Sequence, residues 1–329
     1  MKFTDYKYER PDLELYKKEM EDLLETLETD ITLEQELEII QEVFDLQDEL
    51  STLGGLVSVR NSIDTTDEFY EKEQEFFNEN MPHLQEFGQK FIMKILKSKN
   101  RKGLEKELGS LLFEQSELEL KTFSPEIIPE LQQENKLSTE YSKLMASAKI
   151  EFDGGTYNLS QMRPFTINKD RDVRHRSSLA VSKWFEENES VLDRIYDDMV
   201  KLRNTIAKKL GYENFVQLGY DRLGRTDYNH VDVKSYRDQI FESVVPLVSE
   251  LVERKGKRIE IEDLKSYDLG LSYLTGNPSP KGDSKWQLNH AKTMYEEMSP
   301  ETGKFINFMI DRDLLELDAK PGKAGGGYC

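Results

Sequence analysis

Apolar residues recur every three or four positions along the first half of the chain, which is the spacing of one helical face. Two successive runs show it: Leu13, Tyr16, Met20, Leu23 and Leu27, then Leu33, Leu37, Ile40, Phe44 and Leu50. Pro11 suits a first helical turn, and Thr32 with Gln35 has the form of a capping box. The pattern therefore predicts successive amphipathic helices.

Glycine, proline and capping residues predict where these helices begin and end. We expect Gly54-Gly55 to break the second helix and Pro82 to open another, because glycine weakens helices and proline fits their first turn. Further start signals lie at 65–68, 124–126 and 138–140. The first half should thus contain several separate helices.

The hydrophobic period changes near residue 150. Ile150, Phe152, Tyr157 and Leu159 alternate on either side of Asp153-Gly154-Gly155. Alternation around such a turn is typical of a β-hairpin, which we expect near 150–160.

The second half again has helical spacing. The longest run advances by three, four or seven positions and ends at a glycine stop, Gly211; its members are Trp184, Val191, Ile195, Met199, Leu202, Ile206 and Leu210. A second helix should begin at Asp232 and kink at Pro246. Residues 268–284 are typical of a loop, and Ser299-Pro300-Glu301 should open a last helix. We predict a mainly α fold.

The charge of the chain excludes several classes of partner. Its 329 residues include 45 Lys and Arg against 64 Asp and Glu, giving a net charge of −19. Nucleic acids and anionic membranes bind cationic surfaces, so we expect neither as a partner. No stretch approaches the ~18 apolar residues of a membrane helix, and the N-terminus lacks a secretory signal. A single cysteine, Cys329, favours a reducing, cytoplasmic compartment.

No catalytic centre is complete within the sequence. The four histidines, His83, His175, His230 and His290, are scattered, and the zinc motif HExxH is absent. Calcium loops, nucleophile elbows and P-loops are also absent. Two unusual features remain: the polar stretch 224–229, typical of a loop and helix cap, and the glycines at 325–327, where another backbone could approach closely. By themselves, these glycines suit a flexible tail.

From about Val59 onward the sequence resembles the oligoendopeptidase F family of zinc metallopeptidases, relatives of thimet oligopeptidase. The segments that carry the resemblance are VRNSIDTTDEFYEKEQEFFNEN (59–80), LELKTFSPEIIPELQQENKLSTEYSKLMASAKIEF (118–152), NLSQMRPF (158–165), DRIYDDMVKLRNTIAKKLGYENFVQLGYDRLGRTDYN (193–229), GNPSPKGD (276–283), MSPETGKFINFMIDRDLL (298–315) and AKPGKAGGGYC (319–329). They follow in order through most of the chain.

The resemblance implies a two-lobed helical fold around a deep cleft that admits short peptides. In this family zinc is held by the histidines of HExxH and a later glutamate, and it activates the attacking water. We expect three parts here: an N-terminal helical region (1–115), a helical domain with the hairpin (116–190), and the start of a zincin-type catalytic lobe (191–329). None of the zinc ligands falls within these residues, so the chain should bind no catalytic zinc and be inactive alone.

Within this family, the segment that AGGGYC resembles lies at the cleft edge, where glycine-rich backbone approaches an extended substrate. Gly325, Gly326, Gly327 and Tyr328 are therefore the candidate substrate-binding residues. For 224–229 we favour a structural role over a cleft role. Two alternatives stay open: a non-enzymatic helical protein that binds peptides or a partner, and one half of a split enzyme that needs the missing C-terminal catalytic portion.

Overall fold

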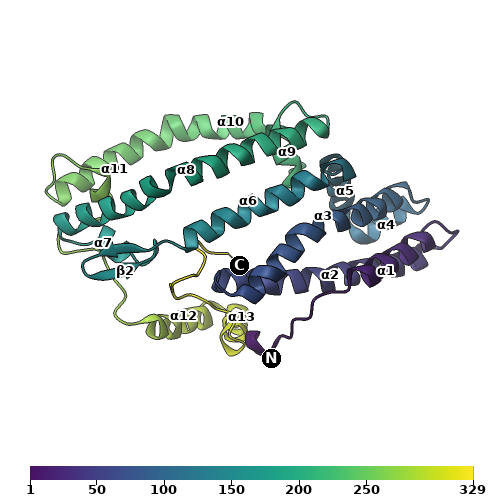
Figure 1. The fold of residues 1–329 in the computed structure, drawn as a ribbon, viewed down its shortest axis with the longest axis horizontal. Coiled ribbons are helices and arrows are strands. Elements are labelled where there is room, and N and C mark those ends of the chain that lie inside the picture. The colour runs from purple at the N-terminus through teal and green to yellow at the C-terminus, as the bar shows by residue number, and fades with distance from the viewer. Residues whose placement is uncertain (329) are drawn as a thin grey trace.

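The computed structural model describes residues 1–328, and Figure 1 shows their arrangement. The helices are α1 (Leu13–Thr26), α2 (Leu33–Ile63), α3 (Glu68–Lys97), α4 (Arg101–Leu108), α5 (Ser110–Thr122), α6 (Ile128–Ala146), α7 (Arg163–Thr166), α8 (Arg171–Lys209), α9 (Phe215–Arg222), α10 (His230–Gln239), α11 (Val245–Arg258), α12 (Ser284–Met298) and α13 (Pro300–Asp311). Short turns are η1 (Phe3–Asp5), η2 (Pro125–Ile127), the π-helical η3 (Ile240–Val244) and η4 (Ser266–Asp268), and the strands are β1 (Ile150–Phe152) and β2 (Gly155–Tyr157). The mainly α prediction is confirmed. Cys329, on which the compartment prediction rests, lies outside the described residues.

The N-terminal helices α1 to α5 share one hydrophobic core. Among its most deeply buried side chains are Met20, Ile40, Val43, Ile95, Leu104 and Phe113, and of these Met20 and Ile40 belong to the predicted apolar runs. The predicted capping box is also present, since the Thr32 hydroxyl accepts from the Gln35 amide and the Gln35 side chain accepts from Thr32. The capping box therefore sets the start of α2 at Leu33, and the buried side chains of the helix follow from there.

The glycine pair does not break α2, contrary to the prediction. The helix runs without interruption from Leu33 to Ile63. A Cβ at Gly54 would lie 3.3 Å from the Phe77 ring of α3, so the missing side chain lets these helices approach closely. Close packing of α2 on α3 outweighs the ~1 kcal/mol by which each glycine disfavours a helix.

Two predicted helix starts are also wrong. Pro82 lies inside α3, and residues 138–140 lie inside α6. The start predicted at 65–68 is confirmed, because α3 begins at Glu68, but the capping residue is Asp67, whose carboxylate accepts from two backbone amides, and not Thr65. The buried side chains Phe77, Leu84 and Phe87 continue across Pro82. Their burial offsets the roughly 3 kcal/mol that proline costs inside a helix.

The middle of the chain forms two further apolar clusters. Ser124 caps η2 as predicted, and Ile127, Ile206 and Leu218 pack together without exposure between η2, α8 and α9. The hairpin is confirmed, with Ile150 opposite Tyr157 and positive φ angles of 48° at Asp153 and 81° at Gly154. It packs with Trp184 and Met162 against α8. Gly211, with φ +84°, follows the end of α8 as predicted.

The unit from α10 through η3 to α11 is exposed along almost its whole length. It lies at the upper edge of Figure 1, and its backbone is irregular at η3, just before Pro246. Pro246 lies in the first turn of α11, directly after η3, and the kink predicted there stays a prediction. The apolar stripe of this unit has side chains that are 44–71% exposed; they are Phe241, Val244, Val245, Leu247, Val248 and Leu251.

The last two helices bring the chain back towards its N-terminus (Figure 1). α12 was not anticipated from the sequence, whereas α13 begins as predicted, with Ser299 accepting from the Thr302 amide. After α13, Phe3 donates its backbone N–H to Arg312, and Lys2 pairs with Asp313 at 2.8 Å. Among residues 1–328, no helix combines the length and apolarity that a membrane crossing requires.

Candidate functional site

The C-terminal segment 319–328 returns to the junction between α2 and α3 (Figure 1). The Gly322 carbonyl accepts from both the backbone N–H and the hydroxyl of Thr65, at 2.9 and 2.7 Å. Next along the segment, the Ala324 N–H donates to the Ser62 carbonyl at 2.8 Å. These bonds explain why Thr65 does not cap α3: its hydroxyl is used to hold the C-terminal segment.

Gly322 is required by the geometry of this junction. Its φ is +77°, a region that side chains disfavour, and a Cβ there would lie 3.2 Å from the Asp64 carboxylate. The Asn158 side chain holds the other end of the segment by donating to the Lys320 carbonyl at 3.1 Å. The segment therefore spans α2 and the end of the hairpin in a fixed position.

The candidate residues Gly325 to Tyr328 lie just beyond these anchors, and all four are exposed. A Cβ on Gly325 or Gly327 would meet no other group within 4 Å, and Gly326 has φ +93°, so the backbone bends there. Among the described residues, the backbone N–H and C=O groups of 325–327 form no hydrogen bond. Tyr328 contacts Ser62 through their hydroxyls at 2.5 Å. The segment thus presents free polar backbone on a fixed support.

A hollow of about 450 Å³ adjoins Gly325 and Gly326. Its opposite wall comes from Tyr141 and Met145 of α6 and from Leu159 after the hairpin. A hollow of this size lies within the range of ligand pockets. The tertiary fold, and not the sequence, brings α6 and the hairpin beside the glycines. Sequence reasoning missed Ser62, Thr65 and Asn158, because nothing local marks them as anchors.

Lys323 stabilises the loop that precedes the glycines. Its ammonium group donates to the carbonyls of Glu316 and Asp318, at 2.9 and 2.8 Å. The ammonium group of Lys323 therefore links two positions of the same loop.

The polar stretch 224–229 lies elsewhere and performs the predicted capping role. Asn229 accepts from the Val231 amide, and Asp232 accepts from the Asn229 amide, so the stretch starts α10. It lines a separate polar recess against α5, and this recess shares no residue with the hollow beside Gly325.

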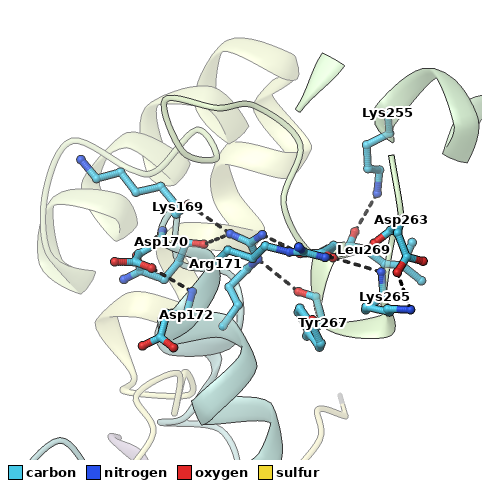
Figure 2. A network of polar contacts seen from close by, with 12 residues as sticks. Lys169, Asp170, Arg171, Asp172, Lys255, Asp263, Lys265, Tyr267 and Leu269 are labelled. Atoms are coloured by element: carbon cyan, nitrogen blue, oxygen red, sulfur yellow. Dashed lines mark hydrogen bonds and ion pairs between the residues drawn. The ribbon is translucent and has the colours of Figure 1, made fainter. Parts of the chain in front are cut away.

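A buried ion pair fixes the start of α8 to the loop after α11 (Figure 2). Asp268 is fully buried and accepts from the guanidinium groups of Arg171 and Arg174, at 2.8 and 2.7 Å. Burial by itself raises the pKa of Asp268, but bonds from Arg171, the Lys265 amide and Arg174 outweigh it, and the pKa falls to about 2. The carboxylate is ionised at neutral pH and has a structural role.

The described residues do not fit a zinc ion. Within residues 1–328, no three or more His, Cys, Asp or Glu side chains come together in a way that could hold a metal. Several buried carboxylates lie instead against cations, as Glu134 does against Arg203 and Arg222. Catalytic zinc needs about three protein ligands, and no such set is present in this part of the chain.

The comparisons with known proteins agree with this architecture. Residues 3–123 match the peptidase M3 N-terminal domain. Among solved structures, one assigned as oligoendopeptidase F has a TM-score of 0.99 at 44% identity, and another, from Bacillus anthracis, has 0.98 at 47%. PZ peptidase A, solved with an inhibitor, has 0.98 at 45%. Each comparison covers 100% of this chain and 58–60% of the other. None of the curated proteins matches the sequence.

The matched domain and the fold place the chain in the M3 peptidase family. The chain belongs to this family, and its structure corresponds to part of oligoendopeptidase F. The resemblance seen in the sequence is therefore confirmed. The chain spans less than two thirds of the length of these solved structures.

Proposed function

We propose that this chain is the N-terminal part of a cytoplasmic, zinc-dependent oligoendopeptidase that hydrolyses short peptides. The observation that carries the proposal is the agreement with oligoendopeptidase F over the whole chain, at 44–47% identity. Because the described residues do not fit zinc, the metal ligands and general base would belong to a further catalytic portion. The chain alone should neither hold catalytic zinc nor cleave peptides.

In this proposal the segment Gly325 to Tyr328 contacts the substrate backbone. Three features support it: the segment is anchored, it is exposed, and the backbone donors and acceptors of its glycines have no partner within residues 1–328. Main-chain hydrogen bonds to an extended peptide give affinity that does not depend on sequence. An enzyme that accepts varied short peptides needs such contacts.

The apolar stripe on α10 to α11 supports a catalytic portion as the partner. Val244, Leu247 and Leu251 are spaced by three and four, so they form one helical face, and each is at least 45% exposed. On α13, Phe305 is 60% and Phe308 44% exposed. Exposed apolar faces of this extent usually mark contact surfaces. We propose that the catalytic portion covers them.

The test mixes the chain with the C-terminal portion of the Bacillus anthracis relative. A quenched fluorescent peptide should be cleaved only by the mixture, and a chelator should stop the cleavage. Chelator-sensitive cleavage by the chain alone, or none by the mixture while the intact relative is active, would count against the proposal. Saturable peptide binding without cleavage in the mixture would favour the non-enzymatic binding protein instead.

The substrate segment has its own test in the active mixture. Gly325→Leu adds a side chain where a Cβ meets no protein group, so the fold should survive while the peptide is obstructed. KM for the peptide should rise at least about tenfold, a loss of roughly 1.4 kcal/mol of binding. Gly55→Leu, also at an open and exposed glycine, is the matched control. An unchanged KM for Gly325→Leu would refute the role of the segment.

A further inference from the structure

A second groove, of about 470 Å³, lies along one face of α3 between α2 and residues of α5 and α6. We call it the amide groove, because five carboxamide side chains line it: Gln47, Gln74, Asn78, Gln85 and Asn135. Buried apolar side chains, among them Leu50, Phe77 and Leu84, contribute to its wall. It shares no lining residue with the hollow beside Gly325.

Much of the hydrogen-bonding capacity of these amides is unused within the described residues. Asn78 is engaged, since it donates to Thr139 and accepts from Gln74. The side-chain oxygens of Gln74 and Asn135 accept no bond from residues 1–328, and the amides of Gln47 and Gln85 form none there. A carboxamide offers a donor and an acceptor side by side, which matches the peptide group.

The dimensions of the amide groove suit an extended chain. Its α3 wall runs from Gln74 to Gly88, which are fourteen helical steps apart, or about 21 Å at 1.5 Å per step. An extended peptide rises about 3.3 Å per residue, so about six residues fit along this wall. A Cβ on Gly88 would meet nothing within 4 Å, so there is open space above this position.

One charge lines the amide groove. Glu119 is the single ionisable carboxylate among the lining residues, and it forms no ion pair within residues 1–328. Its side chain is exposed and therefore accessible to a ligand, and partial loss of water around the carboxyl group raises its pKa. A positive group on a ligand would complement it.

From these features, we propose that the amide groove binds an extended oligopeptide through its backbone and takes a lysine or arginine side chain beside Glu119. Amide pairing with the backbone makes binding tolerant of sequence, while Glu119 adds a preference for one positive residue. The groove is thus a peptide-binding site separate from Gly325 to Tyr328. It does not depend on the function proposed for that segment.

The experiment measures fluorescence polarisation of a labelled alanine-serine octapeptide carrying one lysine, titrated with the full 329-residue chain. A second peptide with norleucine in place of lysine serves as the neutral probe. Gly88→Leu fills the groove and also favours the helix, because leucine is a better helix former than glycine, so the variant should fold. Gly55→Leu is the same change at an open helical glycine outside the groove.

We expect saturable binding that Gly88→Leu weakens at least about tenfold and Gly55→Leu leaves unchanged. Glu119→Gln should remove the preference for the lysine peptide over the norleucine peptide. The proposal that the amide groove binds the peptide is overturned if wild type and Gly88→Leu have equal affinity, or if the wild type does not bind the peptide. A retained lysine preference in Glu119→Gln overturns the role of that carboxylate.

A further variant separates the two peptide sites. Gly325→Leu should leave groove binding unchanged. If Gly325→Leu abolishes binding while Gly88→Leu does not, the peptide occupies the C-terminal segment and the groove proposal fails. If Gly88→Leu alone abolishes binding, the peptide binds in the amide groove, and this conclusion does not depend on the proposed enzymatic function.

Discussion

Replacing Asp268 by asparagine should destabilise the fold strongly, because it removes one side of a fully buried ion pair. The carboxylate holds Arg171 and the buried Arg174, so the variant leaves a guanidinium charge in the interior with a neutral partner. Its pKa falls from 3.8 to about 2 on folding. At about 1.4 kcal/mol per pH unit, this corresponds to roughly 2.5 kcal/mol of folding free energy. Removing one partner of a buried pair costs about 3–5 kcal/mol in other proteins, so we expect about 3 kcal/mol here.

The assay is urea unfolding followed by circular dichroism, at several pH values. The folded pKa lies below the unfolded one, so the ionised carboxylate stabilises the protein fully above about pH 4. This contribution is lost as the pH falls from about 4 to about 2, and the difference between wild type and Asp268→Asn should shrink over that range.

The matched control is Asp263→Asn in the same loop. Its carboxylate is 80% exposed and pairs with Lys265 at 2.7 Å. An exposed pair contributes at most about 1 kcal/mol, so this variant should stay near wild type. The reasoning is refuted if Asp268→Asn loses no more than Asp263→Asn, or if its loss is as large at pH ~2 as at pH ~7.

Three further predictions concern the helices. Gly55→Ala should stabilise α2 by about 0.5–1 kcal/mol, whereas Gly54→Val should destabilise it by about 1–3 kcal/mol, because its side chain meets Phe77; equal melting temperatures for the two variants would contradict the packing argument. Hydrogen exchange should be fastest in α10 to α11, whose side chains are exposed along the unit, and protection equal to that of α2 would contradict it. Leu247→Lys should raise the concentration at which the chain aggregates while changing stability by less than about 0.5 kcal/mol; a larger loss by urea unfolding would show that Leu247 packs in a core.

Apolar periodicity predicted most of the helical elements, because the side chains that define a helical face are the ones that become buried. Met20 and Ile40 are in the core as their spacing requires. Glycine and proline were less reliable guides to where the helices begin and end. Gly54 and Pro82 lie within helices, since burial on both sides of each residue outweighs a local preference of about 1–3 kcal/mol.

The sequence by itself determined the helical class, the hairpin turn at Asp153-Gly154, and the family, because each depends on residues close together in the chain. It also located the glycines at 325–327. Only the tertiary structure decided what surrounds them: Ser62 and Thr65, more than 250 positions away, hold the segment in place. The same is true of the amide groove, whose residues come from separate helices. Long-range contacts of this kind depend on how whole helices pack, and no local pattern encodes them.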